Sequence, residues 1–173
     1  QCSIRCKTER DLAIHIQRNH TPEGLANKLE SEQKLATFLK RNEIPFDHDW
    51  ANRLNFTGCK NIEGARKSAR LDFFLPVEST RLGCVVVIEN NEWQHVGPSY
   101  ACDLQRIFNC GNALENTEEY RGTKLLIINF NPHHYLRDGV RRSHTLQSSH
   151  ELLLKTLRDL TPEDIRTGTN LIY

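Results

Sequence analysis

The sequence has no run of apolar residues long enough to cross a membrane, since no stretch approaches the roughly eighteen that a transmembrane helix needs. Its first residues do not have the pattern of a secretory signal peptide. The formal net charge is only +1, so the chain is not basic as a whole. We therefore expect no membrane partner, and any surface that binds nucleic acid must come from local clusters of positive charge.

Cysteine is too sparse and scattered for a disulfide framework, with six residues in a chain of 173 that has ample apolar sequence for a core. Hydrophobic residues make up 38% of the chain and charged residues 26%, proportions typical of soluble globular proteins. This length suits one well-buried domain with a small appendage rather than two equal domains. We expect an intracellular, reducing compartment, the nucleus included.

Two apolar segments in the middle of the chain each carry an acid. Leu71 to Leu75 reads as a β-strand in which large apolar residues flank Asp72. Cys84 to Ile88 is an almost uninterrupted β-branched run, typical of a strand buried on both faces, and Glu89 follows it. If these strands pair antiparallel around the turn at 76–83, Asp72 and Glu89 lie close together, and their oxygens can share one Mg²⁺ ion.

More polar residues follow Glu89. Asn91 lies on the same face as Glu89, and the imidazole of His95 can carry a proton to or from a reacting oxygen beside a hydrated cation. A helix is expected over about 99–114, and its polar residues at spacings of three share one face: Tyr100, Asp103 and Arg106. Each of these residues alone is more often structural, and only their combination indicates a metal-dependent nuclease.

Two amphipathic helices flank this centre. The first is capped by Thr21, has Pro22 at its first position and runs to about Arg41. The second covers roughly Thr145 to Leu160. We expect it to direct four leucines onto the sheet: Leu152, Leu153, Leu154 and Leu157.

Two further strands are expected, Ile44 to Trp50 and the continuously apolar Leu125 to Phe130. His48, in the first of them, is interpreted as an exposed or edge residue rather than a ligand. The element order is then α-β-β-β-α-β-α, which predicts an α/β fold with an α/β/α core and a mixed central sheet. We assign residues 23–173 to this domain.

The first residues form a separate unit, which we assign to 1–22. Four candidate ligands occur at spacings that a tetrahedral Zn²⁺ ion accepts: Cys2, Cys6, His15 and His20. A helix over 11–19 would present both histidines, with Leu12 and Ile16 as a small apolar core. The other interpretation is an ordinary polar helix with unrelated cysteines and histidines.

The spacing of these four residues resembles two known zinc motifs. One is the two-cysteine two-histidine finger, which would place the first ligand upstream of Gln1. The other is the short knuckle before the nuclease domain of some retrotransposons, whose spacing is closer and which keeps Cys6 as a ligand.

One segment is clearly basic. Between residues 51 and 70, five basic residues accompany a single acid, Glu63, and they are Arg53, Lys60, Arg66, Lys67 and Arg70. A charged run is usually a solvated surface, but this one leads into the strand that carries Asp72, so we expect it to contact the DNA backbone. A second cluster follows the last core strand: Arg137, Arg141, Arg142 and His144.

At these acids the chain resembles the restriction-endonuclease-like superfamily, whose motif is PD-(D/E)xK. Leu71-Asp72 stands for PD, and Glu89-Asn90-Asn91 stands for (D/E)xK with Asn91 in place of lysine. That replacement favours a branch similar to the very-short-patch-repair (Vsr-like) and EDxHD homing endonucleases, in which a histidine takes over. Nuclease-like proteins of algae and large DNA viruses are also similar, over about residues 30–136.

The resemblance implies a restriction-endonuclease-like fold and a division of roles. Asp72 and Glu89 would hold Mg²⁺ or Mn²⁺, and His95 would transfer protons. Asp103 would orient His95. Glu32, on the first helix of the domain, matches an acid of the Vsr-like enzymes, although an acid near the start of a helix also suits the helix dipole.

Two functions stay open from the sequence. One is a Mg²⁺-dependent DNA endonuclease of a mobile element or virus, in which the zinc module aids DNA binding. The other is a zinc-finger DNA-binding module on a nuclease fold that has lost catalysis, which Asn91 would explain. The target sequence, the strand preference and the oligomeric state depend on exposed side chains that a sequence does not reveal.

Overall fold

The structure is a computed structural model that describes residues 9–48, 71–90, 100–132, 135–137, 140–142 and 145–172. One five-stranded sheet has the order β1-β2-β3-β4-β7. The strands are β1 Asp47–His48, β2 Phe73–Leu75, β3 Cys84–Asn90, β4 Lys124–Phe130 and β7 Thr169–Ile172. β1, β2 and β3 are antiparallel neighbours, whereas β4 is parallel to β3 and β7 to β4. The predicted α/β class with a mixed sheet is confirmed.

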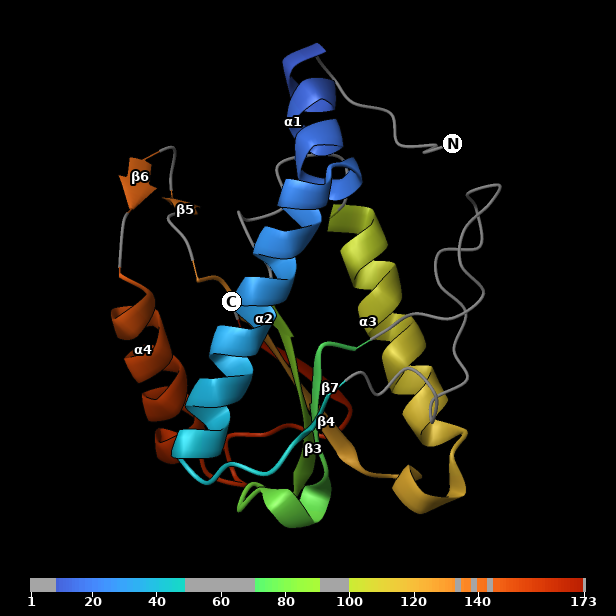
Figure 1. The fold of residues 1–173 in the computed structure, drawn as a ribbon. Helices are drawn as coiled ribbons and strands as arrows, with labels where there is room; N and C mark the ends of the chain where they lie inside the picture. The colour runs from blue at the N-terminus through green and yellow to red at the C-terminus, as the bar shows by residue number, and fades with distance from the viewer. Residues whose placement is uncertain are drawn as a thin grey trace.

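Helices cover both faces of this sheet (Figure 1). The helices of the described chain are α1 Glu9–His20, α2 Pro22–Arg41, α3 Tyr100–Glu115 and α4 Leu146–Asp159, of which α2, α3 and α4 pack on the sheet. α2 and α4 pack on one face through residues such as Leu35 and Leu153, and α3 packs on the other through Leu114. Short elements complete the described chain: the 3-10 turns η2 Val77–Ser79 and η3 Glu118–Tyr120, and a hairpin of β5 Tyr135–Arg137 and β6 Val140–Arg142.

β3 runs through the centre of the sheet, and all seven of its residues are buried. Val86 and Ile88 belong to the cluster under α2 and α4, whereas Val85 and Val87 belong to the cluster under α3. Because successive side chains of a strand point to opposite faces, a strand covered on both sides needs a continuous apolar run. The predicted strand is confirmed, and it extends through Glu89 to Asn90.

The start of α2 follows the signal in the sequence. Thr21 Oγ1 accepts a hydrogen bond from the N–H of Gly24 at 3.1 Å, and Pro22 is the first helical residue. The threonine thereby satisfies one of the backbone donors that a helix start leaves open. Further along, Leu35 and Leu39 are fully buried against the sheet. In the part of the chain that the structure describes, no helix combines the length and apolar composition needed to cross a lipid bilayer.

The edge strands depart from the prediction. β1 has two residues, and positions 49 and 50 of the expected strand lie outside the described residues. Phe46 and His48 both contact the ring of Phe73, at centroid distances of 5.3 and 5.0 Å, as side chains on one face should. β7 was not predicted, because Thr169 to Ile172 has neither an alternating nor a continuous apolar pattern. The β5–β6 hairpin was not predicted either.

Some apolar residues are more exposed than predicted. Leu152 is 62% exposed, whereas Leu153 is 3% exposed. Three consecutive leucines cannot share one side of a helix, so the prediction that Leu152 packs on the sheet is wrong. Leu12 and Ile16 are 43% and 47% exposed and lie one turn apart on α1. The expected apolar core of the zinc module stays a prediction, because residues 1–8 lie outside the described residues.

The two adjacent leucines of α4 form a matched pair for a stability test. Leu153→Ala should lower the free energy of unfolding by about 2 to 5 kcal/mol, because it leaves a cavity in the core. Leu152→Ala should change it by no more than about 0.5 kcal/mol, because the side chain is already largely hydrated. Urea denaturation followed by circular dichroism measures both. Equal losses in the two variants would contradict the observed orientation of α4.

Candidate active site

The candidate site lies at the carboxyl ends of β3 and β4, where the sheet changes from apolar to polar. One row across the five strands consists of His48, Phe73, Ile88, Ile128 and Ile172. One step further on, Glu89 pairs with Asn129. Asp72 directly precedes β2 and falls opposite Glu89 when the β2–β3 register is extended by one residue. The carboxyl ends of strands are the usual location of binding sites in α/β sheets.

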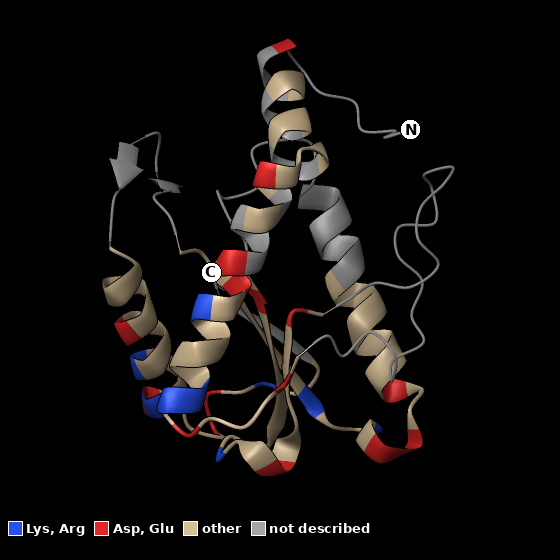
Figure 2. Cartoon of the chain, viewed as in Figure 1, with Lys and Arg blue, Asp and Glu red and all other residues tan. Residues whose placement is uncertain are grey.

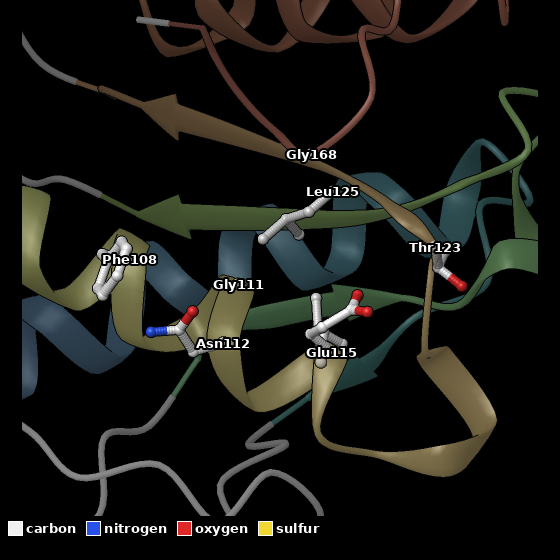
Figure 3. A pocket seen from close by; sticks show the side chains of 8 residues that line it. Phe108, Gly111, Asn112, Glu115, Thr123, Leu125 and Gly168 are labelled. Carbon is white, nitrogen blue, oxygen red and sulfur yellow. The ribbon is translucent and has the colours of Figure 1, made fainter.

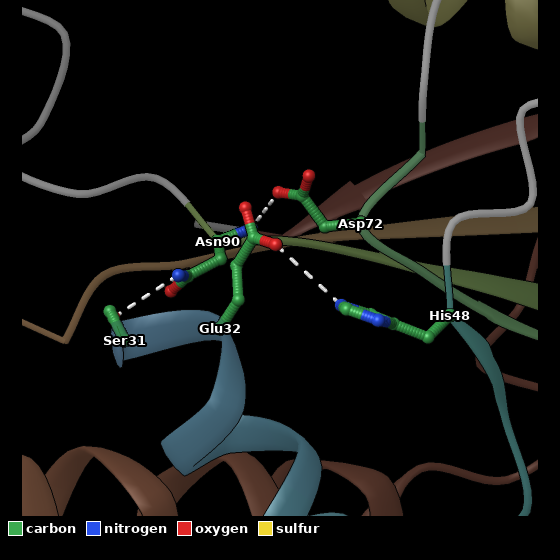
Figure 4. A network of polar contacts seen from close by, with 5 residues as sticks. All are labelled: Ser31, Glu32, His48, Asp72 and Asn90. Carbon is green, nitrogen blue, oxygen red and sulfur yellow. Dashed lines mark hydrogen bonds and ion pairs between the residues drawn. The ribbon is translucent and has the colours of Figure 1, made fainter. Parts of the chain in front are cut away.

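Asp72 is held by the end of β3. Its Oδ2 atom accepts a hydrogen bond from the backbone N–H of Asn90 at 2.9 Å (Figure 4). Asn90 lies beyond the last β2–β3 pair, so the carboxylate takes an N–H that a longer β2 would bond. The strands pair antiparallel as predicted, so the backbones of Asp72 and Glu89 lie opposite each other, and the side chain of Asp72 is directed toward the end of β3.

Glu89 is a buried acid at the same edge, with 9% of its surface exposed. By the alternation of β3 it falls on the side of Val85 and Val87, which faces α3. An acid at this depth is costly unless hydrogen bonds, an ion pair or a cation compensates it. α3 starts from this end of the sheet (Figure 1), and the backbone of Asp103 is in its first turn, while the side chain lies outside the described residues.

α2 contributes two polar residues to the same edge (Figure 4). Ser31 Oγ accepts a hydrogen bond from the side-chain amide of Asn90 at 3.1 Å. The next residue, Glu32, has a carboxylate oxygen 3.6 Å from Nε2 of His48, and its side chain is 12% exposed. The helix, the edge strand and the end of the central strand therefore meet in one polar network, which includes the predicted Glu32.

Described acidic residues lie at both ends of the sheet, whereas most described basic residues lie away from its carboxyl end (Figure 2). The carboxylates of Glu32, Asp72 and Glu89 belong to the carboxyl end of the sheet. Basic residues instead occupy the last turn of α2, with Lys40 and Arg41, as well as the last turn of α4 and the first residue of β4. An edge rich in carboxylates attracts cations.

The donor atoms at this edge suit Mg²⁺, which prefers hard oxygen ligands. Within the described ranges, no three His, Cys, Asp or Glu side chains converge as a group that could hold a metal ion. Mg²⁺ sites commonly use only one or two carboxylates, with water and substrate oxygens filling the other positions. Asp72 and Glu89 fit a site of that kind.

Many of the predicted site residues lie outside the described residues. They are Cys2, Cys6, Arg53, Lys60, Arg66, Lys67, Arg70 and His95. His15 is in α1, but only its backbone is described, and His20 is exposed at the C-terminal end of that helix. The predicted zinc ligands and DNA-contacting residues thus stay predictions.

The network contains residues that the sequence analysis missed. Ser31 and Asn90 join α2 to β3, and His48, which was interpreted as an exposed or edge residue rather than a ligand, pairs with Glu32. His48 is indeed on an edge strand, with its side chain 36% exposed. One feature of the sequence could have indicated a role for His48. It belongs to the strand that precedes the predicted strand of Asp72, and it lies on the same side of that strand as Phe46.

A second histidine is buried just beneath the polar edge. His150 of α4 stacks between Phe38 and Phe130, at ring-centroid distances of 4.3 and 5.5 Å. Phe130 pairs with Asn90 in the β3–β4 register. Nε2 of His150 is buried and makes no hydrogen bond within the described structure. Burial lowers the pKa of His150, so the ring is held in its neutral form.

The two described cysteines of the sheet core have no place in the chemistry of this edge. Cys84 and Cys110 are buried and free of disulfide bonds. Burial raises the pKa of the Cys84 thiol to about 11, with Lys124 opposing the shift in part. A neutral thiol is neither a nucleophile nor a metal ligand, and Cys84 is at the opposite end of β3 from Glu89.

A pocket of about 210 Å³ opens at the other end of the molecule (Figure 3). Phe108 and Glu115 of α3 line it together with Leu125 and Gly168. Leu125 is near the start of β4, and Gly168 precedes β7, so the pocket lies at the amino ends of these strands. It is separate from the polar edge at their carboxyl ends.

Comparisons with models of known protein families, with curated proteins and with solved structures find no match to this chain.

Replacing His150 should show whether its burial affects stability. In the unfolded chain, His150 takes up a proton near its ordinary pKa of 6.5. In the folded chain its pKa is lowered, so His150 takes up the proton only at a lower pH. Acid therefore favours unfolding, and the stability that is full above this range falls as the pH decreases through it.

His150→Phe should reduce the fall in unfolding free energy between about pH 7.5 and about pH 5.5. It should also stabilise the chain at the higher pH by on the order of 1 kcal/mol, because no buried polar atom is left without a hydrogen bond. Urea denaturation at both pH values provides the measurement. His150→Leu is the control, because it also removes the titratable group but has no aromatic ring to stack on Phe38 and Phe130. A variant as pH-dependent as the parent would contradict the assignment.

Proposed function

We propose that the chain is a metal-dependent DNA endonuclease that hydrolyses phosphodiester bonds, with Asp72 and Glu89 as its Mg²⁺ or Mn²⁺ ligands. The observation that supports it most is the position of these two acids opposite each other, one residue beyond the last β2–β3 pair of an antiparallel hairpin in a mixed sheet. Glu32 of α2 is a further acid at the same end of the sheet, on the face opposite to that of Glu89. Acids gathered in this way are suited to binding a cation beside a phosphate group.

The element order also supports the proposal. A helix precedes three antiparallel strands, and a second helix leads to a strand parallel to the third, in the order α2, β1, β2, β3, α3, β4. This agrees with the core order implied by the resemblance to the PD-(D/E)xK superfamily. The acids Asp72 and Glu89 occupy the corresponding strands of the motif.

Each residue then has a chemical task. A bound Mg²⁺ ion would polarise the phosphate and favour deprotonation of the attacking water. The hydrogen bond from the N–H of Asn90 keeps Asp72 in one orientation, so little entropy is lost when a ligand binds it. By resemblance, His95 transfers protons and Asp103 orients it.

The predicted DNA-binding segment is attached on both sides to the site. In the sequence, the segment from Arg53 to Arg70 lies between β1, which ends at His48, and Asp72, which precedes β2. Its five basic residues against one acid favour contact with a phosphate backbone. Positive charge supplied from these anchors would offset the carboxylates that otherwise repel DNA.

A second candidate function is DNA binding through the zinc module on a nuclease fold without activity. The observation in its favour is Asn91, which stands where the motif usually has lysine. The two candidates differ in one readily measured property, the cleavage of DNA in the presence of a divalent cation.

Asp72→Asn should separate binding from cleavage. Nicking of plasmid DNA with Mg²⁺ or Mn²⁺ should fall by at least about 100-fold because an anionic ligand is lost, while DNA affinity persists or rises slightly. Asp159→Asn is the matched control, since Asp159 is exposed at the far end of α4 and pairs only with Lys155 among the described residues. Gel assays measure cleavage, and fluorescence anisotropy measures affinity.

A parent that cuts DNA no faster than Asp72→Asn would show that Asp72 is not in the active site. If the parent is inert with every divalent cation on varied DNA substrates, while Asn91→Lys cuts, the binding-module function replaces the nuclease function for this chain.

The N-terminal module should bind one zinc ion per chain. Its ligands are Cys2, Cys6, His15 and His20, whose spacing allows them to close around a metal ion as the segment folds. Cys6→Ala should lower zinc affinity steeply, whereas Cys110→Ala, a change in the core beneath α3, should leave one zinc per chain. Metal analysis of dialysed protein decides the matter, and a parent without stoichiometric zinc would eliminate this ligand set.

A further inference from the structure

Glu32 and His48 form a pair that the proposed division of roles does not use. A carboxylate oxygen of Glu32 lies 3.6 Å from Nε2 of His48, within ion-pair distance though longer than a hydrogen bond (Figure 4). The Glu32 side chain is only 12% exposed. A carboxylate so far from water needs a polar partner, and the imidazole of His48 is one that the structure provides.

The position of the His48 ring is fixed by a second contact. The ring lies against Phe73 at a centroid distance of 5.0 Å and an interplanar angle of 35°. Phe73 is itself fully buried in the core. With one side on Phe73 and Nε2 toward Glu32, the imidazole keeps Nδ1 for another partner as far as the described residues are concerned. The side chain is 36% exposed, so a substrate has access to it.

The pair is at the same edge as the proposed metal ligands. His48 is directly opposite Phe73, and Asp72 is the residue that precedes Phe73. Glu32 follows Ser31, which bonds Asn90, and the N–H of Asn90 bonds Asp72. Two backbone neighbours and two hydrogen bonds therefore tie the pair to Asp72. Figure 4 shows these five side chains at one end of the sheet.

We propose that Glu32 and His48 are an acid–base dyad of the nuclease site, in which His48 gives a proton to the leaving oxygen and Glu32 orients the imidazole and stabilises its charge. The inference rests on the proposed endonuclease function and assigns this function a proton donor on the opposite side of β2 from the metal ligand Glu89. It also gives Glu32 a definite role.

In the proposed hydrolysis, one phosphorus–oxygen bond forms and another breaks. The oxygen of the attacking water forms a new bond to phosphorus, and the bond from phosphorus to the leaving sugar oxygen breaks. The electron pair of the broken bond stays on the leaving oxygen, which takes the proton from Nδ1 of His48. The attacking water releases its own proton to solvent, and the neutral His48 is protonated again from solvent.

A substrate with a different leaving atom tests the dyad. The bond that the parent cleaves is first mapped on a DNA duplex, and the leaving oxygen at that bond is then replaced by sulfur. A thiolate leaves without a proton, so a general acid is not needed for this substrate. His48→Ala should slow cleavage of the ordinary duplex by on the order of 10² to 10⁴-fold and leave the ratio to the parent on the sulfur duplex close to one.

Glu32→Gln should show the same pattern with a smaller loss, because it removes the charge that stabilises the imidazolium. Glu30→Gln is its matched control, since Glu30 is exposed on the same helix and pairs with Lys34. It should cleave both duplexes like the parent. His48→Gln keeps a polar side chain of similar length, and it is measured beside His48→Ala so that a folding defect in one variant does not decide the result.

The outcomes distinguish the dyad from the function on which it rests. If both His48 variants slow the oxygen and sulfur duplexes equally, or slow neither, the dyad is wrong while the endonuclease function stands. If the parent cleaves neither duplex, the endonuclease function fails, and the dyad fails with it. DNA affinity measured by anisotropy should be unchanged in the His48 variants, and a loss of affinity that accounts for the whole rate loss would also overturn the proposal.

Discussion

The antiparallel register between β2 and β3 is the constraint on which the candidate site depends. β2 has only three residues, and each pairs with an apolar residue of β3. Phe73 and Phe74 are fully buried on opposite faces. A slip of one residue would exchange the faces of both rings and move Asp72 away from the N–H of Asn90. Burial of each ring contributes roughly 1.5 to 3 kcal/mol, so apolar packing within the hairpin sets the position of the carboxylate at its end.

α2 also has apolar residues followed by a polar residue along one side, as the hairpin does. Ser31, Leu35 and Leu39 are spaced by four residues and so form one stripe along the helix. Leu35 and Leu39 pack on the apolar part of the sheet, and Ser31 reaches Asn90 where the sheet becomes polar. The change from apolar to polar therefore occurs at the same level in the helix and in the strand. Docking of α2 through its leucines brings Glu32 to the edge that carries Asp72.

The main strands and helices could be predicted from the sequence because their signals are local. The β-branched run of β3 and the Thr21-Pro22 start of α2 each specify an element without reference to distant residues. β7 could not be predicted in this way, since its four residues become a strand only because β4 offers an open edge. Leu152 was misjudged because composition alone does not tell which of three adjacent leucines faces the core.

The candidate site, like the fold, could be predicted from the sequence only where its signals are local. Asp72 and Glu89 stand out because an acid interrupts or ends an apolar strand, and the turn between the strands implies their pairing. The contacts of Glu32 with His48 and of Ser31 with Asn90 join positions far apart in the chain. They depend on how α2 crosses the sheet, which is a property of tertiary packing. No pattern of spacing within either segment encodes that crossing.

The acids of this edge are an expensive choice for a purely structural role. Glu89 is 9% exposed and the side chain of Glu32 is 12% exposed, so both carboxylates have lost most of their contact with water. Apolar residues of similar volume are often equal or better for stability at buried ionic positions. The contact with His48 reduces the cost of burying Glu32 without explaining why an acid stands there. Binding of a cation, the role proposed for Asp72 and Glu89, would give acids at this edge a functional reason.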